Sequence, residues 1–374
     1  MAEYFATVAR GLEAIAAEEL AELGAEKIEP GFCGVSFSGD RLLLYRVNLW
    51  ARLPFRILLQ LGTFACFDAN DLYQGIRAIT WDTYLSPDRT LAVDATGKSE
   101  LLNHTHFTSL QVKNAIVDQQ QKQYGERSNV DIQNPDLRIN VHIAKEQCTV
   151  SLDSSGDSLH RRGYRPAMGV APLKESLAAA LIRFSGWQPD LAFYDPLCGS
   201  GTLPLEACLS ALKVAPGLFR EKFGFETWQD FNSDQLDQLI LEAEKGQLDS
   251  LSVPIWGSDR NPEVVDQAIA NSKRSGVDQH LHLAEIDLAD VVAPATNGVL
   301  ICNPPYGERL GKNQDLGAFY KLLGDVLKQR FKGWTAYILS GNKELALAIG
   351  LKSSQRIPVY NGTLACQLMK YELY

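Results

Sequence analysis

Short apolar runs alternate with amphipathic stretches through the second half of the chain. The runs span residues 191–194, 255–257, 299–302 and 335–339, and their length is typical of strands that are buried on both faces. Helical stretches separate them, for example 316–330 before the last run. Strands that alternate with helices predict an α/β domain with a mostly parallel sheet.

Two β-rich runs follow at 356–360 and 363–371, and the dipeptide Asn361-Gly362 lies between them. Asn-Gly is the favoured pair of a type I′ hairpin turn, because both central residues of that turn need a positive φ. The sequence therefore predicts that the mostly parallel sheet ends in an antiparallel hairpin.

The first 155 residues have a different pattern, made of short helical and strand-like pieces. Apolar residues between Leu12 and Leu23 fall on one helical face, and residues 107–117 form a second amphipathic stretch. Apolar and polar residues alternate over 137–143 and again over 148–152, which predicts a β-hairpin. The polar segment 154–157 that follows is typical of a domain boundary.

Composition places the chain among globular proteins with more than one domain. It has 374 residues, of which 45% are apolar and 22% are charged, and a domain usually has roughly 100–200 residues. This mix excludes collagen, a coiled coil and wholesale disorder. No apolar run reaches the length of about 18 residues that a transmembrane helix needs. The acidic N-terminus does not resemble a secretory signal, so we expect no membrane association.

The cysteines and histidines are not spaced as metal ligands. The seven cysteines are scattered and none forms a C-x-x-C pair, which indicates reduced thiols, as in a cytoplasmic protein. Two histidine pairs, His104 with His106 and His280 with His282, have no cysteine at ligand spacing. We interpret both pairs as loop or strand residues and expect a cytoplasmic protein without a metal site.

Charge limits how this protein can meet a nucleic acid. With 36 basic and 45 acidic side chains, the formal net charge is −9, whereas a protein that grips nucleic acid over its whole surface is basic. A nucleic-acid partner must therefore contact a local basic patch. The candidate patch is segment 160–166, HRRGYRP, with Arg161, Arg162 and Arg165. A solvated linker is the alternative interpretation of this segment.

A glycine-containing turn follows the predicted strand 191–194. Segment 195–202 reads DPLCGSGT and leads into a helix start. Glycines at such a turn let a ligand approach bare backbone, but the spacing is not G-x-G-x-x-G, so we expect no pyrophosphate cradle. The preceding carboxylate is suited to a cationic group, such as a ligand ammonium, and a tight packing turn is the alternative. The candidate binding residues are Asp195, Leu197, Gly199, Gly201 and Thr202.

Acidic residues also end the next two predicted strands. Asp259 is suited to accept hydrogen bonds from ribose hydroxyls, although residues 212–254 are inserted between it and the glycine turn. Asp287 ends a third strand and is placed to bond an adenine amino group. Either aspartate alone is typical of a helix cap or a turn. Their positions at consecutive strand ends favour a nucleoside site.

The tetrapeptide Asn303-Pro304-Pro305-Tyr306 follows the buried run 299–302. Two prolines stiffen the chain at the carboxyl end of a strand, where open α/β sheets bind ligands. The amide oxygen of Asn303 and the carbonyl of Pro304 are two acceptors that suit an amino group on a planar ring, and Tyr306 offers a face for that ring to stack on. A rigid turn with a surface tyrosine is the alternative interpretation.

These motifs together resemble those of class I S-adenosylmethionine-dependent methyltransferases that act on amino nitrogens. The matching positions are 195–202, Asp259, Asp287 and 303–306. Segments 160–165, 172–178 and 303–310 narrow the resemblance to the THUMP-domain RNA guanine-N2-methyltransferases, most closely those acting on bacterial 23S rRNA. In some of those proteins a second methyltransferase follows in the same chain. We expect none here, because the sequence ends at Tyr374.

The resemblance implies a fold, a cofactor and a partner. It divides the chain into an N-terminal ferredoxin-like region at 1–44, a THUMP RNA-binding domain at 45–155 and a Rossmann-like methyltransferase domain at 156–374. It implies S-adenosyl-L-methionine as cofactor and RNA as partner, most closely 23S rRNA or a precursor of the large ribosomal subunit. Arg161, Arg162 and Arg165 would help to grip the RNA. We expect a monomer.

Several functions remain open at this point. The favoured one is methyl transfer to guanine N2 with Asn303, Pro304, Pro305 and Tyr306 as the catalytic centre. The same tetrapeptide also suits adenine N6 in DNA, guanine N2 in tRNA, or a protein glutamine, and a non-catalytic RNA-binding or ribosome-assembly protein is a further alternative. Methylation of pyrimidine carbon 5 is disfavoured, because it needs a cysteine nucleophile and Cys302 belongs to the strand.

Overall fold

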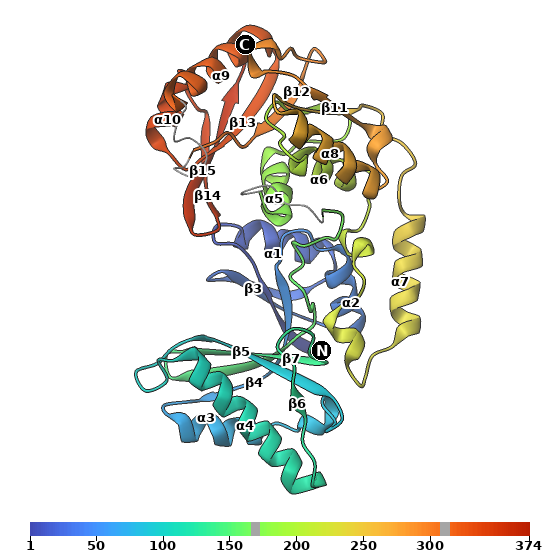
Figure 1. Ribbon diagram of the computed structural model, residues 1–374, viewed down its shortest axis with the longest axis vertical. Helices are drawn as coiled ribbons and strands as arrows, with labels where there is room; N and C mark the ends of the chain where they lie inside the picture. Colours follow the sequence, from blue (N-terminus) through green and yellow to red (C-terminus); the bar gives the residue numbers. More distant parts are fainter. Residues whose placement is uncertain (166–172, 307–314) are drawn as a thin grey trace.

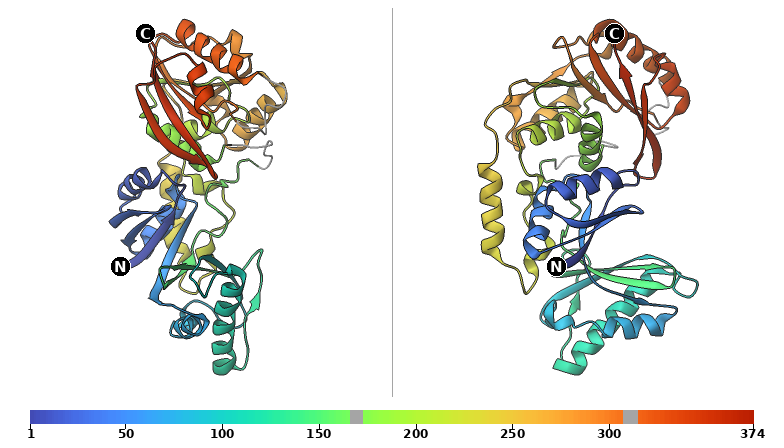
Figure 2. Two further views of the ribbon diagram at one scale, coloured as in Figure 1. Left: turned by 90° about the vertical axis from the view of Figure 1, so that its left-hand side faces the viewer. Right: turned by 180° about the vertical axis from the view of Figure 1, so that it is seen from behind.

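Two β-sheets organise the molecule, and its computed structural model describes residues 1–165, 173–306 and 315–374. Sheet A contains the first eight strands and sheet B contains the last seven strands of the described residues. Sheet B lies at one end of an elongated molecule, while sheet A extends from the middle to the opposite end (Figure 1). The side and rear views in Figure 2 show the same succession.

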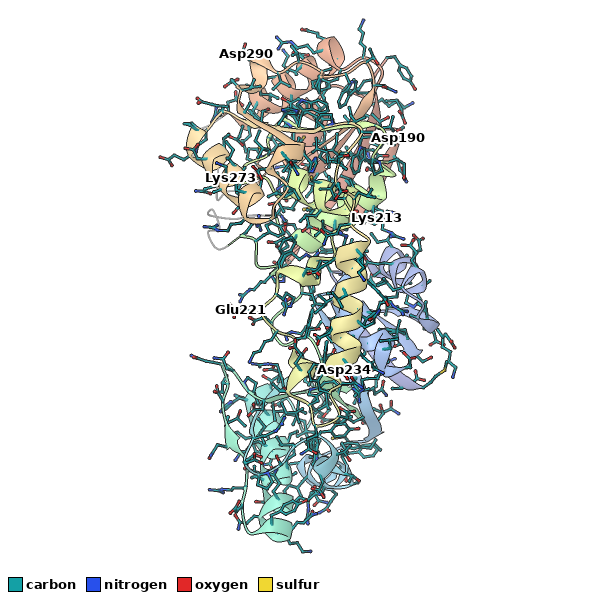
Figure 3. All side chains as sticks on the ribbon, turned by 90° about the vertical axis from the view of Figure 1, so that its right-hand side faces the viewer. Asp190, Lys213, Glu221, Asp234, Lys273 and Asp290 are labelled. Atoms are coloured by element: carbon teal, nitrogen blue, oxygen red, sulfur yellow. The ribbon has the colours of Figure 1, made fainter. Side chains whose placement is uncertain are left out.

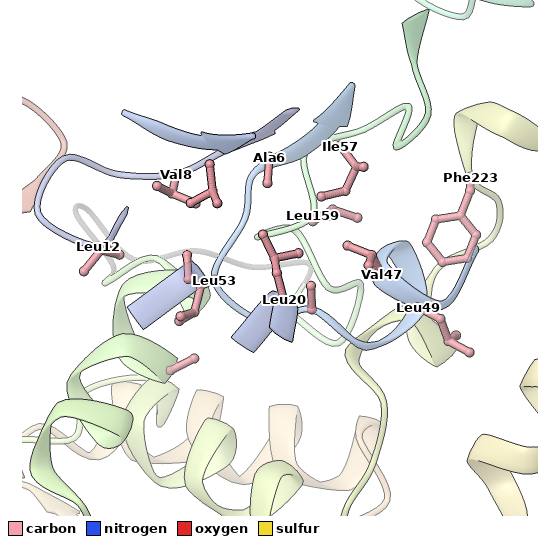
Figure 4. Close-up of a cluster of buried hydrophobic side chains, with 14 of the residues drawn as sticks. Ala6, Val8, Leu12, Leu20, Val47, Leu49, Leu53, Ile57, Leu159 and Phe223 are labelled. Atoms are coloured by element: carbon pink, nitrogen blue, oxygen red, sulfur yellow. The ribbon is translucent and has the colours of Figure 1, made fainter. Parts of the chain in front are cut away.

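The N-terminal part of sheet A forms a first α+β unit. Its elements are β1 (Ala2–Thr7), α1 (Glu13–Glu22), β2 (Glu26–Gly31), β3 (Gly34–Gly39), α2 (Arg41–Trp50) and the first half of β4 (Arg56–Ala65). Buried apolar side chains fill the space between the strands and the two helices, as burial of apolar area requires. Side chains from the later chain join this core, as Figure 4 shows for Leu159 and Phe223.

Helix α2 corrects the predicted boundary between residues 44 and 45. Asp40 caps this helix by accepting a hydrogen bond from the backbone N–H of Leu43 at 2.7 Å, which satisfies one of the free donors at a helix start. The helix then continues without a break to Trp50, with Leu44 and Val47 fully buried. The first unit therefore includes α2 and ends within β4, not at residue 44.

The second unit completes sheet A. Its elements are α3 (Ala69–Arg77), η1 (Trp81–Thr83), β5 (Thr90–Gly97), α4 (Thr105–Tyr124), β6 (Asn129–Val130), β7 (Leu137–Ala144) and β8 (Gln147–Asp153). β4 is shared, because its first half pairs with β1 and most of its length pairs with β8. The predicted hairpin is β7–β8, and both residues of its turn, Lys145 and Glu146, have a positive φ. The helix predicted at 107–117 is longer and includes His106.

Sheet B forms the third unit and is mostly parallel, as predicted. Its strand order is β11-β10-β9-β12-β13-β15-β14, and the pairings from β11 to β13 are parallel while those of β15 are antiparallel. Strand β9, the first along the chain, lies between β10 and β12. The strands are β9 (Ala192–Asp195), β10 (Ile255–Asp259), β11 (Leu281–Glu285), β12 (Gly298–Cys302), β13 (Trp334–Ser340), β14 (Gln355–Asn361) and β15 (Leu364–Glu372).

Helices cover both faces of sheet B, as a sheet of mainly parallel strands requires. They are α5 (Glu175–Ser185), α6 (Thr202–Ala211), α8 (Pro262–Arg274), α9 (Leu316–Arg330) and α10 (Lys343–Ala348), and η4 (Asp278–His280) and η5 (Leu288–Asp290) are short 3₁₀ turns. Residue 172, where the segment 172–178 of the family resemblance begins, lies outside the described residues, and α5 begins at Glu175.

The turn of the C-terminal hairpin differs from the prediction. Asn361 pairs with Leu364 across the hairpin, so the central residues are Gly362 and Thr363. Only Gly362 has a positive φ, at 64°. A glycine at the first central position is the pattern of a type II′ turn, whereas type I′ needs two positive φ angles. The hairpin itself is present, but Asn361 ends a strand and its side chain is used elsewhere.

The insertion at 212–254 joins the three units. It contains η2 (Pro216–Phe219), η3 (Gly224–Thr227) and α7 (Ser233–Lys245), and runs alongside the first unit between the labelled Lys213 and Asp234 (Figure 3). Tyr45 of α2 stacks on Phe225 with ring centroids 4.4 Å apart, which stabilises the contact beyond simple burial. The Thr227 hydroxyl donates to the carbonyl of Asp136 in the second unit.

Within residues 1–165, 173–306 and 315–374, none of the helices combines the length and the apolar character needed to cross a membrane.

Candidate active site

Asp195, Asp259 and Asn303 lie at the carboxyl ends of three adjacent strands. β9 pairs in parallel with β10 on one side and with β12 on the other, with Asp195 opposite Gly257 and Tyr194 opposite Leu300. Since the carboxyl ends of parallel strands share one edge, the structure brings these three side chains to the same edge of sheet B. Ligands of open α/β sheets bind at this edge.

The glycine turn after β9 is fixed to the neighbouring strand β10. The N–H of Cys198 donates to the carbonyl of Ser258 at 2.8 Å, and the N–H of Gly199 donates to Oδ2 of Asp259 at 3.1 Å. Gly201 directly precedes α6 and has φ +85°. Residues other than glycine rarely adopt this backbone conformation. A Cβ added at Gly199 would meet no atom within 4 Å, so this part of the turn faces open space.

Asp195 is the most buried carboxylate at this edge, with 2% of its surface exposed. Its Oδ1 accepts the N–H of Leu197 at 3.0 Å. Burial raises the pKa of Asp195 well above its usual range, and the nearby carboxylate of Asp259 raises it further. A cation placed against Asp195 would favour its charged form, so this position suits a ligand ammonium.

Asp259 and Asp287 both accept backbone hydrogen bonds. Asp259 uses Oδ2 for Gly199 and Oδ1 for the N–H of Asn261 at 3.0 Å. Asp287 is exposed and caps η5 by accepting from the N–H of Ala289 at 2.9 Å. Each carboxylate oxygen can accept a second hydrogen bond. Both aspartates are therefore turn residues, as in the alternative interpretation, with acceptor capacity left for a ligand.

The Asn303 side chain holds a buried acceptor that has no partner in the described part of the chain. Its Oδ1 is buried and receives no hydrogen bond from any of the residues that the structure describes. A buried oxygen without a donor costs roughly 1–3 kcal/mol, so the position favours a ligand that carries an N–H. Pro304 is buried and Pro305 is half-buried directly after it, which holds the backbone of Asn303 in place.

Tyr306 is packed against the C-terminal hairpin. Its hydroxyl accepts a hydrogen bond from Nδ2 of Asn361 at 2.8 Å. Its ring lies over Gly341, where an added Cβ would come within 3.0 Å of the ring. Burial raises the pKa of the Tyr306 phenol, so it is not an acid or base near neutral pH. Tyr306 is half-buried, and its ring is held by two contacts that the sequence motif did not reveal.

Two of the three predicted RNA-binding arginines are corrected by the structure. Arg162 has 1% of its surface exposed, and its guanidinium lies 3.5 Å from the carboxylate of Glu206. Arg165 is 9% exposed and forms an ion pair with Glu175 at 2.9 Å. Charges that have lost their water need such internal partners. Neither side chain is therefore available to grip RNA, and of the three only Arg161 is exposed.

The side chain of Thr202, a predicted cofactor residue, has a partner inside the protein. Its side chain is buried, and its hydroxyl accepts a hydrogen bond from Arg165. Thr202 is the first residue of α6, directly after Gly201. Arg165 therefore connects the arginine-rich segment with the helix that begins at the glycine turn. Through this contact the Thr202 side chain helps to hold the turn in place.

Glu206 is a central residue that the sequence analysis missed. It accepts a hydrogen bond from the Tyr164 hydroxyl at 2.8 Å and faces Arg162 and Arg52. Arg52 in turn donates to the carbonyl of Val214 at 2.6 Å. The available signal was a lone acidic residue inside the apolar segment 203–209, because a carboxylate is almost never fully buried without a partner.

An open cleft of about 770 Å³ lies beside the arginine-rich segment. Burial and then the positive charges of Lys174 and the neighbouring arginines lower the pKa of His160 to about 4, so cations lie close to this histidine. Arg161 and Lys222 are exposed and make no side-chain hydrogen bond or ion pair to the described residues. Residues lining the cleft include Arg56, Asp157, His160, Arg161, Glu221 and Lys222, and Figure 3 labels Glu221 on this side.

Cys302 has the wrong environment for a nucleophile. It is the last residue of β12 and has no exposed surface. Burial raises the pKa of its thiol well above the usual range, and the thiolate is the reactive form of cysteine. This finding agrees with the argument against methylation of pyrimidine carbon 5.

Three family models match successive parts of the chain. The model described as "RlmL ferredoxin-like domain" matches residues 3–58, the "THUMP domain" model matches 66–153, and "RMKL-like, methyltransferase domain" matches 162–370. The last match covers more than half of the chain. The predicted combination of ferredoxin-like, THUMP and class I methyltransferase domains is confirmed, and the THUMP domain indicates RNA binding.

Two curated relatives match almost the whole chain. "Putative RNA methyltransferase slr0064" from Synechocystis is 56% identical to this chain. The match covers 97% of the relative and 99% of this chain. "Ribosomal RNA large subunit methyltransferase K/L" from Syntrophotalea carbinolica is 40% identical over 99% of this chain but only 53% of its own length. The chain thus spans about half the length of the K/L relatives it matches.

A solved structure identifies the cofactor. The protein in the crystal structure of "SMU.472, a putative methyltransferase complexed with SAH" is 31% identical to this chain, with a TM-score of 0.91. The match covers 98% of that protein and 100% of this chain. SAH is what remains of S-adenosylmethionine after its methyl group has left, so the predicted cofactor is confirmed. The open space at Gly199 and the buried Asp195 carboxylate fit its bulk and its ammonium group. On this evidence the chain belongs to the RMKL-like methyltransferases that carry a ferredoxin-like and a THUMP domain.

Proposed function

We propose that this protein methylates the exocyclic N2 of a guanosine in 23S rRNA. The observation that carries the proposal is the buried Oδ1 of Asn303, which has no partner among the described residues and lies on the same sheet edge as the cofactor residues. An amino group on a flat ring satisfies such an acceptor. The 40% identity to a ribosomal RNA large subunit methyltransferase supports ribosomal RNA as the substrate, with a cytoplasmic location.

The proposed cofactor residues lie at the ends of β9, β10 and β11, whereas the tetrapeptide follows β12. Asp195 would receive the ammonium of S-adenosylmethionine, Asp259 its ribose hydroxyls and Asp287 its adenine. Gly199 would let it approach the backbone. When bound, the cofactor supplies an electrophilic methyl group on a good leaving group. Catalysis then depends mainly on aiming the nucleophile, because orientation alone removes much of the barrier.

Asn303 and Pro304 orient the nucleophile. The lone pair of guanine N2 is delocalised into the ring, and hydrogen bonds from the amine to the Asn303 amide oxygen and the Pro304 carbonyl favour a tetrahedral nitrogen. N2 then takes the methyl group and afterwards loses a proton to water. An amide does not ionise near neutral pH, so Asn303 acts as an acceptor and not as a base.

Tyr306 supplies the surface on which the target base rests. A guanine inside a duplex cannot reach a pocket at a sheet edge, so it has to be unpaired or flipped out of the helix. Base flipping is stabilised by stacking on an aromatic side chain. The hydrogen bond from Asn361 fixes the Tyr306 ring before the base arrives.

Nucleoside mass spectrometry of rRNA from a strain lacking this protein tests the proposal. We expect one N2-methylguanosine of 23S rRNA to disappear and to return with the wild-type gene or with Asn297→Ala. Asn297 is an exposed asparagine before β12 and serves as the matched control. Asn303→Ala should not restore the nucleoside. Loss of a methylated nucleoside from tRNA, or no loss from any RNA, would contradict the proposal.

A further inference from the structure

The C-terminal hairpin meets the first unit near Tyr306, at a cluster of two aromatic residues and one arginine. The β14–β15 hairpin extends from sheet B to the side of β1–α1 (Figures 1 and 2). Gly11 marks the contact, because an added Cβ there would come within 2.9 Å of the carbonyl oxygen of Pro358 in β14. The cluster that we consider consists of Arg10, Phe32 and Tyr360, and we call it the aromatic–arginine cluster.

The three residues are arranged around the Arg10 guanidinium. Its central carbon lies 4.8 Å from the ring centroid of Tyr360 and 6.0 Å from that of Phe32. These distances are those of cation–π contacts. The Glu13 carboxylate holds together the two loops that carry Arg10 and Phe32. It accepts hydrogen bonds from the N–H of Gly11 at 2.8 Å and from the N–H of Cys33 at 3.1 Å.

The cluster is held in place yet remains open to solvent. Phe32 has 81% of its surface exposed, more than any other phenylalanine among the exposed apolar side chains of the described residues. Arg10 is exposed and Tyr360 is half-buried. An exposed phenylalanine at a β-turn adds little to the folded state, since its apolar area is not removed from water. The arrangement therefore offers a fixed, flat surface with a positive charge.

A short chain of contacts connects the cluster with the catalytic tetrapeptide. Tyr360 is followed by Asn361, whose side-chain amide donates to the Tyr306 hydroxyl at 2.8 Å. The same hairpin therefore carries one ring of the cluster and the residue that fixes the proposed base-stacking tyrosine. A nucleotide strand that places its target base on Tyr306 would run past this surface.

We propose that the aromatic–arginine cluster is a second stacking site, which binds unpaired RNA bases that flank the target. Aromatic rings and arginine guanidinium planes are the groups on which proteins stack unpaired bases. Flipping one base leaves its neighbours without a stacking partner, so a second platform beside Tyr306 stabilises the opened strand. The inference rests on the proposed function only in placing the target base at Tyr306.

A binding experiment tests the site without requiring methyl transfer. The full chain is titrated with a fluorescein-labelled single-stranded RNA 12-mer and, separately, with the same strand in a duplex. Phe32→Ala should weaken single-strand binding about 5- to 150-fold, the range measured when one stacked base loses its ring. Phe32→Trp should restore it, because a larger ring still stacks. Tyr374→Ala is the matched control, since Tyr374 is 94% exposed and lies outside the cluster.

The outcomes separate this inference from the proposed function. Single-strand binding by Phe32→Ala within twofold of wild type would overturn the stacking site, as would an equal loss for the duplex. A loss that tryptophan fails to restore would also overturn it. The binding result does not depend on which nucleoside is methylated, so a negative result from the mass spectrometry leaves this test standing. Melting temperatures of all variants should match wild type, because Phe32 is exposed.

Discussion

The catalytic edge of sheet B and the arginine-rich segment both carry polar side chains, but those side chains have different surroundings. At the edge, Asn303 keeps a buried acceptor without a described partner, and the turn at Gly199 faces open space. In the arginine-rich segment, Arg162 and Arg165 are enclosed and paired with Glu206 and Glu175. Some atoms of that network, Nε of Arg162 and Oε2 of Glu206, also make no hydrogen bond to the described residues. What differs is charge: the opposite charges of the network face each other across the domains, whereas the neutral Asn303 oxygen has no donor opposite it among the described residues.

The tetrapeptide 303–306 and the arginine-rich segment 160–166 also differ in how far their sequence determines their surroundings. A tetrapeptide with two prolines fixes its own backbone, so the sequence motif already specifies the local geometry. The availability of an arginine depends on residues elsewhere in the chain. The carboxylate that faces Arg162 belongs to Glu206, which lies 44 positions later. Charge density in a sequence does not distinguish an exposed patch from an internal network.

The largest expected effect is at the catalytic edge. Asn303→Ala should lower the single-turnover rate of methyl transfer by about 10²–10⁴, as for other positioned polar groups. Cofactor affinity should change little, since Asp195 and Asp259 follow other strands. An alanine variant as fast as wild type would remove Asn303 from the catalytic centre.

Asn303→Asp sharpens this test, because a carboxylate also accepts hydrogen bonds from an amine. It should retain more activity than Asn303→Ala. Its rate should fall on acidification, since protonation removes an acceptor, whereas the wild-type amide has no such titration. Rates measured against pH for all three proteins would show whether the side chain acts as an acceptor or as a base.

The next effect concerns the arginine-rich segment. Arg165→Met should lower the free energy of unfolding by about 3–5 kcal/mol, because Glu175 is left buried without its partner. Arg161→Met, an exposed arginine in the same segment, should change it by less than about 0.5 kcal/mol. Chemical denaturation measures both. Equal effects for the two variants would contradict the distinction between paired and exposed arginines.

This loss should depend on pH in a defined direction. Burial raises the pKa of Glu175, and the charge of Arg165 opposes that shift. Without Arg165 the folded-state pKa rises further, so the variant gains stability by protonation as the pH falls. The difference between wild type and Arg165→Met should therefore be largest near neutral pH and smaller in mild acid.

Much of the third unit was predictable because its signals are local. Buried strands such as 299–302 and helices such as 316–330 are determined by periodicity within a few residues, and β12 and α9 occupy these positions. The boundary at residue 44 was not predictable in this way. β4 belongs to both units of sheet A, and its two partners β1 and β8 are about 145 residues apart in sequence.

The site shows the same division between local and distant causes. The order of Asp195, Asp259 and Asn303 at strand ends follows from β/α alternation. The contacts that support them do not, because Asn361 reaches Tyr306 from a hairpin 55 positions later. Arg165 reaches Thr202 across 37 positions. Such contacts depend on tertiary packing and become visible only in the folded chain.

A smaller effect is expected for the residue that links the two neighbouring strand ends. Asp259→Ala should weaken S-adenosylmethionine binding by about 1–3 kcal/mol, the cost of losing hydrogen bonds to a charged acceptor. Part of this loss comes through the turn, because Asp259 accepts from the N–H of Gly199. Asp259→Asn keeps one acceptor and should lose less. Calorimetric titration would contradict the assignment if a folded alanine variant bound the cofactor as tightly as wild type.

The smallest expected effect tests what remains of the basic patch. Arg161 is exposed beside the open cleft, so Arg161→Gln should remove about one phosphate contact and reduce the salt slope of RNA binding by about 1. Arg274→Gln, an exposed arginine at the end of α8, is the control and should leave the slope unchanged. Stacking on Phe32 involves no phosphate, so Phe32→Ala should weaken binding without changing the slope. An unchanged slope for Arg161→Gln would mean that RNA contacts the THUMP and ferredoxin-like units without using the cleft, and that the whole arginine-rich segment serves to hold the domains together.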